Sequence, residues 1–78
     1  MMEPPVATYE WIVVYRHDPP KRQTTFRYAV HNRKSGEIIA WVRWYGPWRQ
    51  QVLFPEPDTV WSAGCLRDVC DFIGGDRR

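Results

Sequence analysis

The chain has 78 residues, of which 44% are hydrophobic and 26% charged, and its formal net charge is +2. This length gives one domain with a thin core, and this composition is that of a globular protein rather than a disordered chain. No apolar run approaches the roughly 20 residues of a membrane-spanning helix. The aromatic content of 15% exceeds what a thin core readily buries, so some rings are expected at the surface.

The N-terminal segment, residues 1–8, contains two consecutive prolines and predicts a flexible arm. It lacks the basic region and apolar run of a signal peptide, so export is not expected. Residues 9–16 are rich in aromatic and β-branched residues, which predicts the first strand. Both faces of this strand are apolar, so the pattern does not decide which one is buried. A charged loop with two prolines is expected over residues 17–23.

Residues 24–32 alternate between apolar and polar side chains, which predicts a half-buried second strand with Arg27 on its polar face. A turn containing Gly36 follows, so residues 37–45 are expected to return as the third strand of a hairpin. In that strand the alternation places Ile38, Ala40, Val42 and Trp44 on one face and Ile39, Trp41, Arg43 and Tyr45 on the other.

Gly46 and Pro47 predict a second turn, after which residues 48–54 form the fourth strand. After this strand the spacing of the apolar residues changes to that of a helix. Ser62 is the predicted N-cap of this helix, and Gly74 is predicted to end it. Residues 74–78 are expected to form a flexible tail. The helical spacing i, i+3, i+4, i+7 predicts a buried face made of Leu66, Val69, Cys70 and Ile73.

The order of these elements predicts an α+β domain over residues 9–73. It consists of an antiparallel four-stranded β-sheet followed by one C-terminal α-helix packed on one face, in the order β-β-β-β-α. Because one helix covers one face of a sheet, the other face is expected to be exposed.

Charge and cysteine placement bear on partners and location. Residues 16–49 carry eight bases and two acids, whereas residues 50–78 carry three bases and five acids, so the middle of the chain is expected to attract an acidic partner. Cys65 and Cys70 lie five residues apart in the predicted helix and point about 140° away from each other. Unpaired thiols and a location in a reducing cytoplasm are therefore expected.

The sequence lacks the residue groups that catalysis requires. His17 and His31 do not combine with the two cysteines at the spacing of a metal site, so neither metal nor cofactor is expected. No glycine-rich loop precedes a helix, and no nucleophile can be matched with a base and an orienting acid. We therefore expect a binding protein and not an enzyme.

Basic and aromatic residues interleave on the polar face of the hairpin and in the turn after it. Rings offer planes for stacking, and arginine offers forked donors for phosphate or carboxylate. The same residue types are typical of protein–protein hot spots. Alternatively, the rings simply cover a thin sheet and the arginine stems lie over them. The predicted partner-binding residues are Arg27, Trp41, Arg43, Tyr45, Trp48 and Arg49.

Four short patterns in the C-terminal half resemble short proteins of phages and other mobile elements. They are Ser35-Gly36-Glu37, WYGPWRQ from Trp44 to Gln50, FPEPDT from Phe54 to Thr59, and CLxDxxDFI from Cys65 to Ile73. Small proteins of mobile elements include inhibitors of host defence, among them the anti-CRISPR proteins. The resemblance implies an inhibitor that binds a CRISPR effector subunit and blocks its target-DNA site or its recruitment of a nuclease.

The leading hypothesis from the sequence is therefore a stoichiometric, monomeric inhibitor of the anti-CRISPR type. It would act in the cytoplasm of a bacterial host cell, through its exposed sheet face and basic hairpin, on a protein surface of the effector complex. A nucleic-acid-binding module that uses the same residues is the first alternative, and it predicts an affinity that falls as salt rises. The second alternative is a structural or assembly protein of a virion.

Overall fold

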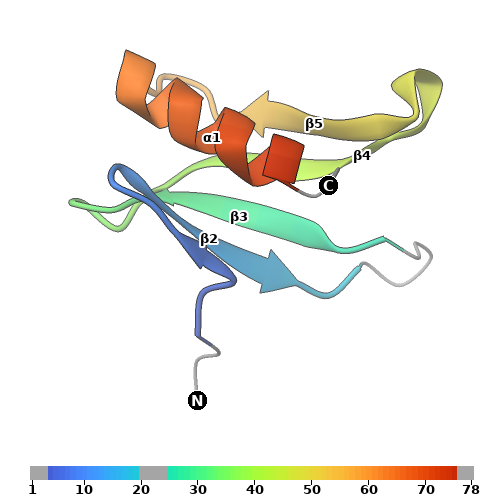
Figure 1. Ribbon diagram of the computed structural model, residues 1–78, viewed down its shortest axis with the longest axis horizontal. Coiled ribbons are helices and arrows are strands. Elements are labelled where there is room, and N and C mark those ends of the chain that lie inside the picture. Colours follow the sequence, from blue (N-terminus) through green and yellow to red (C-terminus); the bar gives the residue numbers. More distant parts are fainter. Residues whose placement is uncertain (1–3, 20–24, 76–78) are drawn as a thin grey trace.

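The computed structural model describes residues 4–19 and 25–75. It shows one antiparallel sheet in the order β1-β2-β3-β4-β5, with a single helix lying along one side of it (Figure 1). The elements are β1 (Ala7–Thr8), β2 (Ile12–His17), β3 (Arg27–Asn32), β4 (Ile38–Tyr45), the 3-10 turn η1 (Gly46–Trp48), β5 (Gln50–Pro55) and α1 (Ala63–Gly75). No helix among the described residues is long and apolar enough to cross a membrane.

The predicted class is confirmed as α+β with one antiparallel sheet and one C-terminal helix, but the predicted count of four strands is wrong. The chain turns at residues 9–11, where the backbone N–H of Tyr9 donates to the carbonyl of Ile12 at 2.8 Å. Ala7 and Thr8, which fall in the range predicted as an arm, therefore pair with β2 as a fifth strand. Parts of the predicted arm, loop, second strand and tail (residues 1–3, 20–24 and 76–78) lie outside the described residues.

A shift of register in the β3–β4 hairpin changes which isoleucine is buried. Val30 pairs with Ala40, but His31 pairs with Ile38, so Ile39 is the extra residue of a bulge. Ile39 is 7% exposed and belongs to the core, whereas Ile38 is 39% exposed. The predicted faces of these two residues are therefore wrong, because a bulge interrupts the alternation on which that prediction depends. From Ala40 onward, Ala40 and the buried Val42 follow the predicted faces.

The core lies between the helix and one face of the sheet. Side chains directly opposite each other in an antiparallel pair share a face, and Val14, Val30 and Ala40 form such a row across three strands. All three are fully buried, and they belong to one cluster with Cys65 and Val69 of α1. This cluster fixes the side of the sheet that the helix covers.

The helix begins as predicted, because the hydroxyl of Ser62 accepts a hydrogen bond from the backbone N–H of Cys65 at 3.2 Å. Its predicted buried face is rotated, however. Leu66 is 49% exposed and Cys70 is also exposed, whereas Cys65 and Asp68 are buried beside Val69. Both thiols are free.

A contact with the β1–β2 turn sets this rotation. The backbone N–H of Trp11 donates to the Asp68 carboxylate at 2.9 Å, across 57 positions in the sequence. The Trp11 ring also lies against Gly64, where a Cβ atom would stand 2.5 Å from Cδ1 of the ring. We call this contact of Trp11 with Gly64 and Asp68 the helix clasp. It holds the polar Asp68 inward, which the apolar spacing of the helix does not indicate.

Replacing Asp68 by alanine is expected to lower the free energy of unfolding by about 1–3 kcal/mol, because the part-buried backbone N–H of Trp11 loses its acceptor. Urea denaturation followed by tryptophan fluorescence measures this difference. Asp71→Ala is the matched control, because Asp71 is an exposed carboxylate on the same helix, and it should change stability by no more than about 0.5 kcal/mol. Equal effects of the two substitutions would contradict the clasp.

Candidate binding face

The face of the sheet opposite α1, which we call the open face, is not covered by any described element of the chain. Its composition follows from the strand register, because directly opposed residues share a face. The open-face positions are Thr8 of β1, Val13, Tyr15 and His17 of β2, Arg27, Ala29 and His31 of β3, Ile38, Trp41, Arg43 and Tyr45 of β4, and Gln50, Val52 and Phe54 of β5. None of these positions is acidic, and most of them are aromatic or basic.

Two arginines on this face lie over aromatic rings. The guanidinium carbon of Arg27 is 5.3 Å from the centre of the Trp41 ring, and that of Arg43 is 3.9 Å from the centre of the Phe54 ring. Both distances lie within the range of cation–π attraction. Trp41 and Phe54 are opposite each other on β4 and β5, so the two arginine–ring pairs are neighbours.

These two arginines carry positive charges near one acidic residue, Glu56. Neither guanidinium forms an ion pair with the described part of the chain. The Nε atom of Arg27 is moreover buried and without a hydrogen-bond partner there. A buried donor without a partner is unusual in native proteins, and either a water molecule or another bound group would satisfy it.

A hollow of about 260 Å³ lies between these two arginine–ring pairs. We call it the arginine hollow. It is lined by Arg27, Trp41, Arg43, Phe54, Pro55 and Glu56. Glu56 is the one acidic residue of the lining, and it follows the end of β5 at Pro55.

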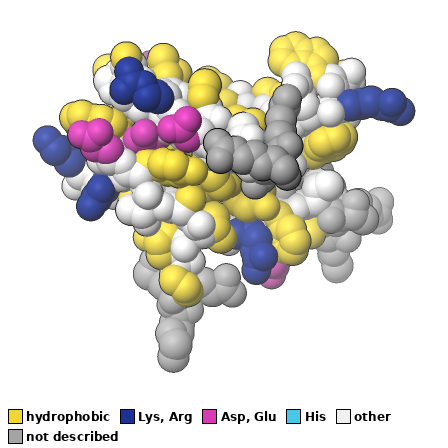
Figure 2. All heavy atoms as spheres, viewed as in Figure 1, with side chains coloured by type: hydrophobic (Ala, Val, Ile, Leu, Met, Phe, Trp, Pro, Cys, Tyr) yellow, Lys and Arg dark blue, Asp and Glu magenta, His cyan; other side chains and the backbone are white. Residues whose placement is uncertain are grey.

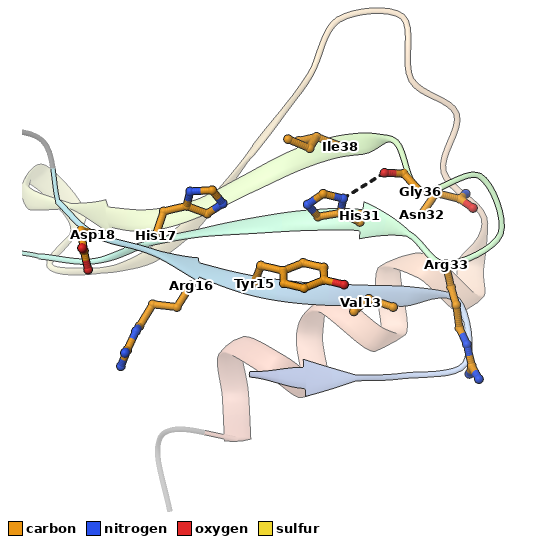
Figure 3. Close-up of a pocket in the computed structure, with 10 residues that line it drawn as sticks. All are labelled: Val13, Tyr15, Arg16, His17, Asp18, His31, Asn32, Arg33, Gly36 and Ile38. Carbon is orange, nitrogen blue, oxygen red and sulfur yellow. Dashed lines mark hydrogen bonds between the residues drawn. The ribbon is translucent and has the colours of Figure 1, made fainter. Parts of the chain in front are cut away.

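A larger hollow of about 600 Å³ lies beside it, over β2, β3 and the start of β4 (Figure 3). We call it the histidine hollow. The Tyr15 and His31 rings meet edge to face in it, with their centres 4.8 Å apart. The His31 ring is held by a hydrogen bond of 3.0 Å between Nδ1 and the carbonyl of Gly36. Since a carbonyl only accepts, Nδ1 carries the proton.

One pair of rings separates the two hollows. His17 lines the histidine hollow, and Trp41 lines the arginine hollow. The two rings meet edge to face with their centres 5.2 Å apart. Ala29 lies beside them, opposite both Tyr15 and Trp41, and is fully buried although it faces away from the helix. A small side chain at the centre of the open face is thus covered by the larger rings around it.

The structure brings five of the six predicted binding residues together. Arg27, Trp41, Arg43 and Tyr45 lie on the open face, and the Trp48 ring packs edge to face on Tyr45 at 5.2 Å between centres. The sixth, Arg49, follows η1 in a left-handed conformation with φ of 53° and makes no ring contact.

Tyr15, His17, His31 and Phe54 lie on the open face but were not among the binding residues predicted from the sequence. The alternating pattern of the second strand does place His31 on the same face as Arg27, because the two residues are four positions apart. Tyr15 could not be placed, because both faces of the first strand are apolar in its first half. His17 was predicted to lie in the following loop, whereas it is the last residue of β2 and pairs with Arg27. Phe54 reaches the face only through its pairing with Trp41.

On the helix side of the molecule, acidic side chains gather over α1 (Figure 2). The open face and the helix side therefore differ in charge among the described residues. In that same part of the chain, no group of three or more His, Cys, Asp or Glu side chains could hold a metal ion.

Comparisons of the chain with protein-family models, with curated proteins and with solved structures find no match. The function proposed for the protein is therefore inferred from the geometry of the open face.

Proposed function

We propose that the protein is a binding module that holds single-stranded nucleic acid on the open face and catalyses no reaction. The observation that carries this proposal is the pairing of Arg27 with Trp41 and of Arg43 with Phe54 on a sheet face without acidic positions. Such pairs combine a positive charge for phosphate with a ring for stacking.

Single strands fit this arrangement better than duplexes. The bases of a single strand expose their faces, and each base that stacks on an aromatic side chain contributes about 1–3 kcal/mol. The rings on the open face lie at the ends of the side chains of a sheet, where splayed bases can reach them. A duplex keeps its bases stacked inside, and the described residues contain no exposed helix with a basic face to enter a groove.

Binding of a labelled 12-nucleotide single-stranded DNA is expected to weaken as salt rises, because arginine contacts with phosphate release counterions. With about three neutralised phosphates, the affinity should fall roughly tenfold to thirtyfold between 50 and 200 mM salt. Fluorescence anisotropy measures this dependence. In Arg27→Ala/Arg43→Ala the slope should be shallower, whereas Arg67→Ala, which removes an exposed arginine of α1, should leave it unchanged. An unchanged slope in the double variant would refute this role of the two arginines.

A second candidate function is the inhibition of a CRISPR effector of the kind expected from the sequence. The observation that favours it is the β4–β5 turn, where Trp48 is 62% exposed and Arg49 follows it at the surface. Exposed tryptophan and arginine side chains are the residue types most enriched in protein–protein hot spots. We propose this turn as the contact with the effector protein.

Affinity capture with purified effector complexes tests the inhibitor. Trp48→Ala should abolish capture if the turn is the contact, while Trp41→Ala should preserve it. The opposite ranking would place the open face at the effector, in competition with nucleic acid. A protein that captures no effector and does not reduce target-DNA cleavage is not an inhibitor of those effectors.

A further inference from the structure

We propose that the arginine hollow and the histidine hollow together form one nucleotide site, with the phosphate in the first and the base in the second. This inference rests on the proposed function. It identifies a single nucleotide of the bound nucleic acid as the part that the open face holds most tightly. Three observations support it. They are the guanidinium groups without ion pairs in the arginine hollow, the aromatic and apolar lining of the histidine hollow, and the ring pair between the two hollows.

The arginine hollow has the properties of a phosphate site. Two guanidinium groups reach it from neighbouring strands, and neither forms an ion pair in the described part of the chain. Each guanidinium lies over an aromatic ring, Trp41 or Phe54, and this contact restricts the side chain before an anion binds. At about 260 Å³ the space is smaller than typical pockets for drug-sized ligands, which suits a compact anion.

Glu56 limits which anion binds there. Its carboxylate lines the same hollow and repels a second negative charge that comes too close. A phosphodiester carries one negative charge, whereas a terminal phosphate monoester at neutral pH carries up to two. The site should therefore accept the internal phosphate of a strand more readily than inorganic phosphate alone.

The histidine hollow has the properties of a base site. Its volume of about 600 Å³ lies within the range of small-molecule pockets. Its lining combines aromatic and aliphatic side chains with the charged residues Arg16, Asp18 and Arg33 at its rim. Tyr15 and His31 supply flat surfaces from β2 and β3, and Val13 and Ile38 supply apolar ones. These side chains can stack against or enclose a base.

His31 also supplies a fixed polar contact. Its Nδ1–H is engaged by Gly36, which leaves Nε2 as an acceptor in the neutral ring. In Figure 3 this second nitrogen lies on the side of the ring that faces His17, away from Gly36. An exocyclic amino group of adenine or cytosine is a matching donor.

The position of the ring pair joins the two hollows into one site. The His17–Trp41 contact, with 5.2 Å between ring centres, joins a residue of the larger hollow to a residue of the smaller one, and His17 is also directly opposite Arg27 on β3. The sugar of a nucleotide would cross at this pair, with its base on the β2 side and its phosphate on the β5 side. Linking the two parts converts the second contact into an intramolecular one and raises the total affinity.

Two-dimensional ¹H–¹⁵N NMR titrations with the methyl ester of AMP, with adenosine and with dimethyl phosphate test this site. We expect the ester to bind at least tenfold more tightly than either fragment, with shift changes at both hollows. Arg43→Gln should reduce the affinity for the ester to that for adenosine and leave adenosine binding unchanged. Tyr15→Leu should reduce the affinity for the ester to that for dimethyl phosphate and leave dimethyl phosphate binding unchanged. Arg67→Gln, on α1, is the control that removes the same charge outside the site.

An ester that binds no better than adenosine, or an Arg43→Gln variant that binds it unchanged, would overturn the inference. The 12-nucleotide DNA separates this failure from that of the proposed function. If the DNA binds while the ester does not, the open face binds single-stranded DNA without a dedicated nucleotide site. If neither binds, both proposals fail, and a protein partner for the open face takes their place.

Discussion

The Trp41→Ala variant is expected to bind single-stranded DNA about tenfold to a hundredfold more weakly than the native chain. A base stacked on an aromatic side chain contributes about 1–3 kcal/mol, and each 1.4 kcal/mol is about tenfold in affinity. The loss should extend beyond one stacked base, because the Trp41 ring also supports the guanidinium of Arg27 and contacts His17. Anisotropy titrations at fixed salt measure the effect.

Trp44→Ala is the matched control for this variant. Trp44 lies on the same strand, is 42% exposed, and points to the face opposite that of Trp41. Its removal should change the affinity by less than about twofold, since it has no contact with the open face. Trp41→Phe should retain most of the binding, because it keeps a ring at this position.

This pair of variants also decides between the two interpretations of the aromatic residues. If the rings only cover a thin sheet, Trp41→Ala lowers the free energy of unfolding and leaves the affinity of the folded protein unchanged. If they form a binding face, the affinity falls while the far-ultraviolet circular dichroism of the folded variant stays native. Measuring stability and affinity on the same samples separates the two effects.

The second large effect is expected at the helix clasp. Gly64→Ala should lower the free energy of unfolding by about 1–2 kcal/mol, because the new methyl group would overlap the Trp11 ring. Overpacking of this kind costs about 1–3 kcal/mol, and the better helix propensity of alanine offsets part of it. In a domain of this size the melting temperature should fall by about 4–8 °C for each kcal/mol.

Gly74→Ala provides the matched control for the clasp. A Cβ atom at Gly74 meets nothing within 4 Å, so the same chemical change should be neutral to within about 0.5 kcal/mol. Thermal unfolding followed by circular dichroism compares the two glycine variants directly. Equal melting temperatures would show that the Trp11 ring moves aside without loss, and the clasp would not determine how the helix docks.

The sequence predicted the fold where local patterns decide it. The alternation of residues around Val30 and Val42, the turn at Gly36, and the cap at Ser62 each depend on near neighbours, and the structure agrees with them. These features required no knowledge of how distant segments meet.

The predictions that failed depend on tertiary contacts. The bulge at Ile39 inserts one residue into the alternation, and nothing in the local pattern indicates it. The rotation of the helix depends on Trp11 meeting Asp68 across 57 positions, and apolar spacing favours Leu66 instead. The extra strand forms because Ala7 and Thr8 find partners on β2, although the prolines before them favour an arm.

In the candidate site, too, the residues on one strand could be predicted from the sequence, whereas contacts between strands could not. Trp41, Arg43 and Tyr45 share a strand, so their common face followed from a period of two. The pairing of Arg43 with Phe54 and of Tyr15 with His31 depends on which strands are neighbours and in what register. The two hollows therefore became visible only once the strands were placed side by side.

The five tryptophan indoles provide the most direct measurement of the central claim, that nucleic acid binds on the open face. A ¹H–¹⁵N spectrum of the indole groups, recorded during a titration with 12-nucleotide single-stranded DNA, reports on both sides of the sheet at once. Trp41 lies on the open face, whereas Trp11 and Trp61 pack on the helix side. Binding of nucleic acid on the open face predicts a large, saturable shift of the Trp41 signal and unchanged signals from Trp11 and Trp61. Shifts confined to Trp11 and Trp61, or an unchanged Trp41 signal at saturating DNA, would contradict it.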